Sequence, residues 1–111
     1  MGMVEITNVE EFKKEVLEAS DTVVVDFNAD WCGPCQMLRP ILDFVANEQA
    51  KAGDDSVKFA SVNIDVLPEI AEEYEVSGIP CLIKFENGTE TDRAVGLISQ
   101  KKLGKFVGIK S

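Results

Sequence analysis

Two cysteines separated by two residues, Cys32 and Cys35, are the part of this sequence best suited to chemistry. They stand in the stretch DFNADWCGPCQM, after a run of β-branched residues and before a helical pattern. Cys32 therefore falls at the N-terminus of a predicted helix, where free backbone N–H groups and the helix dipole favour a thiolate. Cys35 follows one turn later, within the distance that a disulfide tolerates. We expect Cys32 to attack a disulfide and Cys35 to resolve the mixed disulfide.

Two other uses of the pair stay open at this point. A bracing disulfide across so short a loop would remove little chain entropy and would stabilise the fold weakly. A metal or iron–sulfur site would need more ligands than the pair, and the chain has no histidine and a single further cysteine, Cys81. The lack of histidine also excludes Ser-His-Asp and Cys-His nucleophiles. We therefore favour a redox pair, with no bound cofactor and no metal.

Length and charge limit the remaining classes. With 111 residues, of which 45% are hydrophobic, we expect residues 1–111 to form a single domain with its own core. The net charge of −9 argues against nucleic acid or a membrane surface as partner. The start, MGMVEITNVEEFKKEV, has neither a basic segment nor an apolar one, so we expect no leader and a cytoplasmic location. We expect a monomer.

Short strands alternate with helical patterns along the chain. The hydrophobic periodicity predicts a sheet with two interior strands and a hairpin turn at Asn87-Gly88. A capping box at Thr7 and Glu10 opens the first helix, and Ser99 caps the last. Pro40 is expected to kink the long helix that follows Gly33. Strands are predicted at 3–6, 22–27, 57–64, 79–85 and 91–95, and helices at about 8–17, 33–53, 68–74 and 100–107. The order βαβαβαββα indicates an α/β fold, with a mixed central β-sheet flanked by helices on both faces.

Four stretches together resemble the thioredoxin family: VVVDFNADWCGPCQMLRPIL, VNID, VSGIPCLIKFENG and AVGLISQKKL. The resemblance runs from about Ile6 to Val107, and its WCGPC core is specific to thioredoxins proper. It implies the thioredoxin fold and a protein-disulfide reductase that cycles between dithiol and disulfide. Its partners would be thioredoxin reductase and disulfide-containing protein substrates.

The resemblance also implies roles for residues around the pair. Asp26 is similar to the family's buried carboxylate, which takes a proton from the resolving cysteine and returns it. The residues themselves agree, since an Asp within an apolar strand should have a raised pKa. Pro80 matches the family's cis-proline, which presents the backbone of Ile79 to an extended substrate. The implied docking surface comprises Trp31, expected to be half exposed, with Gly33, Pro34, Ile64, Gly78, Ile79 and Gly96.

Four positions depart from the family pattern. Asn28 stands where an aromatic is common, and Gln36 where a Lys or Arg is common. Ser61 replaces a lysine near the buried carboxylate, so we expect Asp26 to lack a cationic partner. Cys81 follows Pro80 where threonine is usual. It is either a small buried hydrophobe or a third thiol close to the pair, which could trap Cys32, join a cluster or sense oxidation.

Three rival functions stay open. The first is a binding module that uses the same surface without redox turnover. The second is a metal or iron–sulfur protein that uses Cys81. The third is an oxidant or isomerase. The Gly-Pro dipeptide between the cysteines argues against this third function.

Overall fold

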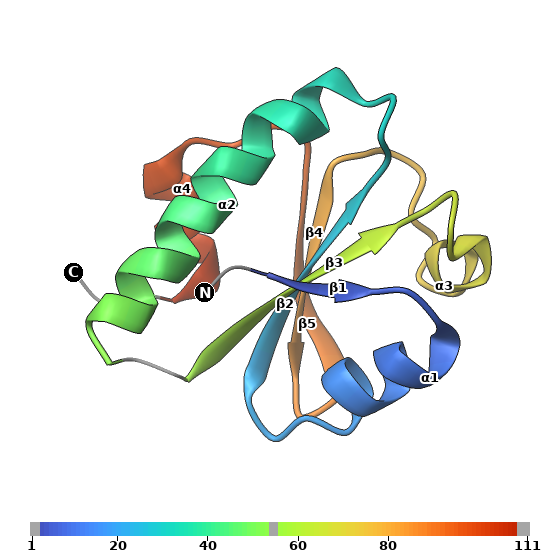
Figure 1. Cartoon of the computed structure of the whole chain (residues 1–111), viewed down its shortest axis with the longest axis horizontal. Coiled ribbons are helices and arrows are strands. Elements are labelled where there is room, and N and C mark those ends of the chain that lie inside the picture. The colour runs from blue at the N-terminus through green and yellow to red at the C-terminus, as the bar shows by residue number, and fades with distance from the viewer. Residues whose placement is uncertain (1–2, 54–55, 109–111) are drawn as a thin grey trace.

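A five-stranded mixed sheet lies at the centre of the computed structural model, which describes residues 3–53 and 56–108 (Figure 1). The strands follow the order β1-β3-β2-β4-β5 across the sheet. The first three of these run parallel, and β4 and β5 run antiparallel to their neighbours. Their bounds are β1 Val4–Ile6, β2 Thr22–Asn28, β3 Val57–Asn63, β4 Cys81–Glu86 and β5 Thr89–Val95.

Helices cover both faces of the sheet, as Figure 1 shows. One face carries α1 and α3, and the opposite face carries α2 and α4. The predicted order βαβαβαββα and the mixed sheet are confirmed. The helices are α1 Val9–Phe12, continued as the π-helix η1 Lys13–Leu17, then α2 Gly33–Lys51, α3 Pro68–Glu73 and α4 Gln100–Val107.

The central strand β2 divides the core into two halves. Successive side chains of a strand point to opposite faces, and every residue from Val23 to Phe27 is buried. Val23, Val25 and Phe27 pack into the cluster beneath α1 and α3. Val24 packs with residues of α2 and α4. Asp26 follows Val24 in the same alternation, so its carboxylate faces α2.

The helix ends explain most of the differences from the sequence prediction. Asn8 caps α1, not Thr7, because its side chain accepts the N–H of Glu11. The Glu11 carboxylate in turn accepts from the N–H and the hydroxyl of Thr7, so the predicted capping box is wrong by one residue. Ser99 caps α4 as predicted, accepting the N–H of Lys102.

The long helix α2 begins with Cys32 as its N-cap. It continues through Pro40 and ends at Lys51, two residues before the expected Gly53. The kink expected at Pro40 stays a prediction. Within residues 3–53 and 56–108, every helix is too short or too polar to span a bilayer.

The hairpin between β4 and β5 turns at Asn87 and Gly88, as predicted. Both residues have positive φ, 53° and 79°, which suits a tight turn between antiparallel strands. Strand β4 begins at Cys81, because Pro80 has no N–H for the ladder, and β5 begins at Thr89.

Candidate active site

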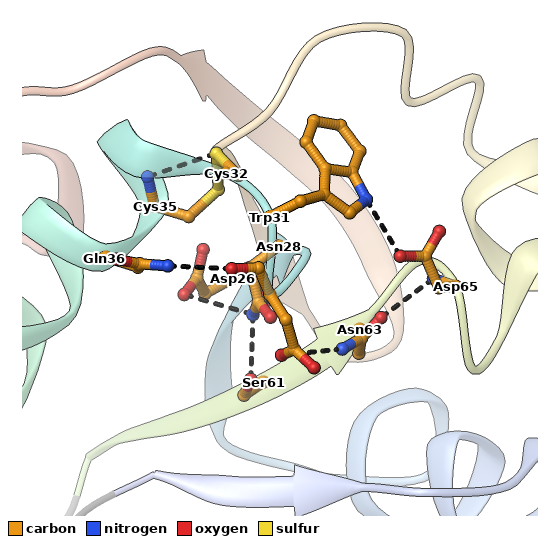
Figure 2. Close-up of a disulfide and its surroundings, with 10 residues drawn as sticks. Asp26, Asn28, Trp31, Cys32, Cys35, Gln36, Ser61, Asn63 and Asp65 are labelled. Atoms are coloured by element: carbon orange, nitrogen blue, oxygen red, sulfur yellow. Dashed lines mark hydrogen bonds between the residues drawn. A yellow bond between two sulfur atoms is a disulfide. The ribbon is translucent and has the colours of Figure 1, made fainter.

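Cys32 and Cys35 form a disulfide at the N-terminus of α2, with their Cα atoms 5.2 Å apart (Figure 2). The backbone N–H of Cys35 donates a hydrogen bond to the Cys32 sulfur at 3.2 Å. Both residues are buried, with 4% and 5% of their surfaces exposed. Exposure therefore does not distinguish the two sulfurs. Their positions do, because Cys32 occupies the cap of the helix and Cys35 its first turn.

Apolar residues from three connections close around the disulfide. Ala29 follows β2, Ile64 follows β3, and Ile79 precedes β4; all three pack with the cysteines. The Ile79–Pro80 peptide bond is cis, as the resemblance implied. The Pro80 carbonyl accepts the N–H of Gly96 at 2.8 Å, which joins the start of β4 to the end of β5.

Trp31 stands at the edge of this group and is 68% exposed, more than the half exposure expected. Its indole N–H donates to the Asp65 carboxylate at 2.9 Å (Figure 2). The Asp65 N–H donates to the side-chain oxygen of Asn63, whose amide group reaches Asp30. A chain of hydrogen bonds thus fixes an exposed aromatic ring beside the disulfide.

The other predicted docking residues are buried to different extents. Gly33 and Pro34 are exposed, Ile64, Gly78, Ile79 and Gly96 are partly buried, and Pro80 is buried.

Sequence reasoning missed three exposed apolar residues next to these positions: Val66, Val95 and Leu97, which are 55%, 60% and 44% exposed. A side chain at Gly78 would contact Val95, so these two residues are neighbours in space. The available signal was apolar residues in a loop or at a strand end, one or two positions from predicted docking residues.

Asp26 lies below the disulfide and is 1% exposed. One carboxylate oxygen, Oδ2, accepts a hydrogen bond from the Asn28 amide at 3.3 Å. The other, Oδ1, has no hydrogen-bond partner among the described residues. Burial raises the pKa of the Asp26 carboxyl to about 7, while Arg39 and the Asn28 hydrogen bond lower it. Asp26 is therefore a buried acid whose proton is exchangeable near neutral pH.

A cleft of about 290 Å³ brings Asp26 and Cys35 together at the N-terminal half of α2. It gives a buried carboxylate and a buried sulfur a shared opening toward solvent. A proton can pass between such groups directly or through water in the cleft. The lining residues are Asp26, Asn28, Ala29, Asp30, Cys35, Gln36 and Arg39.

Three of the four departures from the family pattern lie at this site. Asn28 donates to Asp26 and, at 2.9 Å, to the Ser61 hydroxyl. Gln36 donates to the Asp30 backbone carbonyl at 2.7 Å. We expected Asp26 to lack a cationic partner, and no ion pair to Asp26 is formed within the described part of the chain; Arg39 on α2 nevertheless lowers the pKa of its carboxyl electrostatically.

Cys81 lies on the other face of the sheet. It is 1% exposed and packs beneath α1 and α3 with its register partner Phe27. The next residue, Leu82, pairs with Asp26 and faces α2. Burial raises the pKa of the Cys81 thiol. In the part of the chain that the structure describes, no group of three or more Cys, Asp or Glu side chains could hold a metal ion. The geometry thus favours the buried-hydrophobe interpretation of Cys81.

Comparison with known proteins agrees with this geometry. The family model described as Thioredoxin matches residues 3–108. The chain is 46% identical over 92 residues to the thioredoxin of Rickettsia typhi, covering 83% of this chain and 84% of that protein. It is 43% identical over 105 residues to the thioredoxin of Chlamydia caviae, covering 95% and 96%. A solved mutant thioredoxin from Halobacterium salinarum superposes with a TM-score of 0.83 at 30% identity, covering 96% of this chain and 88% of that one.

Proposed function

The chain belongs to the thioredoxin family and is a thiol–disulfide oxidoreductase acting on protein disulfides, and we propose how its residues share that reaction. The observation that supports the proposal most is the disulfide at the cap of α2, where a backbone N–H points at the Cys32 sulfur. A thiolate at this position is stabilised by the hydrogen bond and by the helix dipole.

The reaction starts from the reduced dithiol. The Cys32 thiolate attacks one sulfur of a substrate disulfide, forming a mixed disulfide and releasing the first substrate thiolate. The Cys35 thiol loses its proton and attacks the Cys32 sulfur, which releases the second substrate thiolate. Over the whole reaction, the substrate disulfide gains two electrons and two protons. The dithiol loses two electrons and two protons and becomes the Cys32–Cys35 disulfide.

Asp26 is the group placed to take the Cys35 proton. It shares the cleft with Cys35, and its pKa of about 7 suits a base that accepts and returns a proton near neutral pH. Burial supports this role, since a solvated carboxylate would have a pKa too low to hold the proton.

The substrate is held by the apolar surface around Cys32. Ile79 packs against the disulfide, Trp31 is exposed next to Cys32, and Val66, Val95 and Leu97 extend the exposed apolar area. We propose that the backbone at the cis Ile79–Pro80 bond receives an extended peptide segment of the substrate, as the family resemblance implies.

The disulfide formed in each cycle must be reduced again. We propose a thioredoxin reductase as the electron donor, because the Cys32–Cys35 pair gives up its two electrons in each cycle and must receive them again from another molecule. A reducing compartment such as the cytoplasm suits a carrier that must start each cycle as a dithiol.

The test is turnover of a protein disulfide, with insulin as substrate and dithiothreitol as reductant. The parent should accelerate reduction over dithiothreitol alone, and the double variant Cys32→Ser/Cys35→Ser should not. A parent with no turnover would overturn the reaction proposed here and favour a redox-independent binding module. A double variant that retains turnover would overturn the roles proposed for Cys32 and Cys35. Recycling by a purified thioredoxin reductase with its own electron donor tests the partner separately.

A further inference from the structure

Asp26 belongs to a row of polar residues that crosses three strands of the sheet. Glu5 on β1 is the register partner of Ser61 on β3, and Ser61 is the register partner of Asp26 on β2. Register partners point to the same face, and Asp26 faces α2, so the row Glu5–Ser61–Asp26 lies beneath that helix. It places two carboxylates on either side of a short hydroxyl. Ser61 carries no charge that could compensate them.

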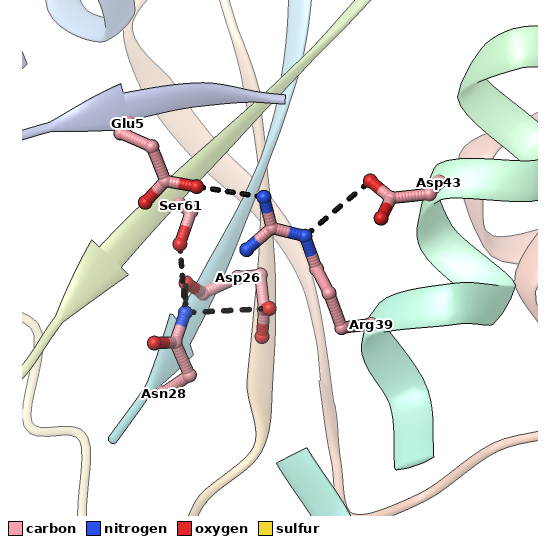
Figure 3. A network of polar contacts seen from close by, with 6 residues as sticks. All are labelled: Glu5, Asp26, Asn28, Arg39, Asp43 and Ser61. Carbon is pink, nitrogen blue, oxygen red and sulfur yellow. Dashed lines mark hydrogen bonds and ion pairs between the residues drawn. The ribbon is translucent and has the colours of Figure 1, made fainter. Parts of the chain in front are cut away.

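The cation that compensates them comes from α2. Arg39 Nη2 donates to the Glu5 carboxylate at 2.7 Å, and Arg39 Nε donates to the Asp43 carboxylate at 3.3 Å (Figure 3). The guanidinium is thereby held from two sides, over the strands that carry the row. Arg39 also lies one helical turn after Cys35 and lines the same cleft. A single side chain thus borders both groups between which the proton moves.

Among the described residues, Arg39 is the cation with an electrostatic effect on Asp26. The charged groups with an electrostatic effect on the carboxylate are Arg39 and Asp43 from α2 and Glu5 from β1. Its uncharged neighbours include Asn28, which donates a hydrogen bond, and its register partners Ser61 on β3 and Leu82 on β4. Of the three charged groups, Arg39 favours the ionised carboxylate, whereas Glu5 and Asp43 disfavour it.

We propose that Arg39 is a positioning residue for proton transfer, whose guanidinium, held by Glu5 and Asp43, stabilises the Asp26 carboxylate while Asp26 takes the Cys35 proton. This inference rests on the base role proposed above for Asp26. In the step concerned, the S–H bond of Cys35 breaks and an O–H bond forms on Asp26. The Cys35 sulfur then bonds to the Cys32 sulfur, the substrate thiolate leaves, and the Asp26 proton passes to solvent through the cleft.

The resolving step can be followed directly with a chromogenic disulfide. Reduced protein is mixed with dithiobis-nitrobenzoate in a stopped-flow instrument. The first thionitrobenzoate appears when Cys32 attacks, and the second appears when Cys35 resolves. The rate of the second release is measured from pH 5 to pH 9. It should rise with pH as Asp26 ionises.

Replacing the cation should move this profile to higher pH. Arg39→Gln should shift the midpoint of the second release to higher pH by roughly half a pH unit or more, because the ionised carboxylate loses its compensating charge. Arg39→Lys should stay close to the parent. The matched control is Lys51→Gln, which removes an exposed positive charge at the far end of the same helix and should leave the midpoint unchanged.

Repeating the Arg39 substitution in a protein without the Asp26 carboxylate separates an electrostatic effect from an effect of altered packing. In an Asp26→Asn protein, the Arg39→Gln substitution should no longer move the midpoint. An unchanged midpoint in Arg39→Gln, or a shift that persists without the Asp26 carboxylate, overturns the role of Arg39. Failure of the reaction scheme itself has a different signature, since the parent would then show no second release at all. Circular dichroism melts check that each variant is folded before the comparison.

Discussion

The backbone N–H of Cys35 points at the sulfur of Cys32 across 3.2 Å, at the first turn of α2. Cys32 is the N-cap residue, so its sulfur occupies the place where a Ser or Asp oxygen normally accepts such a bond. A thiolate accepts this hydrogen bond more strongly than a thiol does. The relationship therefore gives the two cysteines different chemistry, although they are buried to the same extent.

The first prediction concerns this difference. Cys35→Ser should accumulate a mixed disulfide between Cys32 and a protein substrate, because the attack proceeds and the resolving thiol is missing. Mass spectrometry of the quenched reaction should find the substrate peptide on Cys32. Cys32→Ser is the matched control and should accumulate little adduct. Equal trapping on Cys35 in that control would contradict the assignment of attacking and resolving sulfurs.

Much of this site could be predicted from sequence because its signals are local. The Cys32 and Cys35 pair follows a buried strand and opens a helical pattern, and both signals lie within about twenty residues. Asp26 interrupts an otherwise apolar strand, which predicts a buried carboxylate without any knowledge of its neighbours. The neighbouring caps Thr7 and Asn8 illustrate the limit of local signals, since both side chains suit the cap and one residue of register decides between them.

The contribution of Arg39 could not be predicted in this way. On the sequence, an arginine in the middle of a helix indicates a solvated face. Its partner Glu5 lies 34 positions away on an edge strand. Only the packing of α2 over the row that contains Ser61 and Asp26 brings the charges together. The same long-range dependence applies to Cys81, whose orientation follows from its register with Phe27.

The second prediction is a pH dependence of stability set by Asp26. Its pKa is about 7 in the folded protein and close to the ordinary carboxyl value of 3.8 when unfolded, so the folded state binds more protons between these values. The free energy of unfolding should therefore fall as pH rises from about 4 to about 7, and this contribution should be constant above 7. Asp26→Asn removes the ionised buried carboxylate. Its free energy of unfolding at pH 8 should therefore exceed that of the parent by up to about 4 kcal/mol.

Urea unfolding of the oxidised proteins at pH 5, 6, 7 and 8 measures this gain. Asp30→Asn is the matched control, because Asp30 lines the same cleft but is exposed. Its unfolding free energy should follow that of the parent at every pH. A stability difference between parent and Asp26→Asn that is the same at pH 5 and pH 8 would contradict the raised pKa.

The third prediction concerns Cys81. Its thiol is buried beneath α1 and α3, and burial raises its pKa, so it should be poorly reactive in the folded protein. With Cys32 and Cys35 oxidised, iodoacetamide should modify Cys81 on the order of 100-fold more slowly than in guanidinium. Cys81→Ala should cost about 1–2 kcal/mol of stability through the lost packing. It should leave the rate of thionitrobenzoate release unchanged. Rapid labelling of the native protein, or a dimer linked through Cys81, would instead support the third-thiol interpretation.

The last prediction concerns the hydrogen bond between Trp31 and Asp65. The indole ring is largely exposed beside the disulfide, and its N–H reaches the Asp65 carboxylate at 2.9 Å. Asp65 is itself held through Asn63, so the ring is fixed before substrate binds. Removing the acceptor should free the ring, and part of the binding energy would then be used to order it again.

Asp65→Ala should therefore raise the KM for insulin by roughly threefold, as expected for one hydrogen bond of about 0.5–1 kcal/mol at an exposed site. The second release of thionitrobenzoate should be unaffected, since that step takes place between Cys35 and Cys32. Trp31 is the single tryptophan of the chain, so its fluorescence anisotropy reports its mobility directly and should fall in the variant. Asp21→Ala, an exposed acidic position just before β2, is the control for the loss of one negative charge. A slower second release with an unchanged KM would instead mean that Asp65 acts on the cysteines and not through the ring.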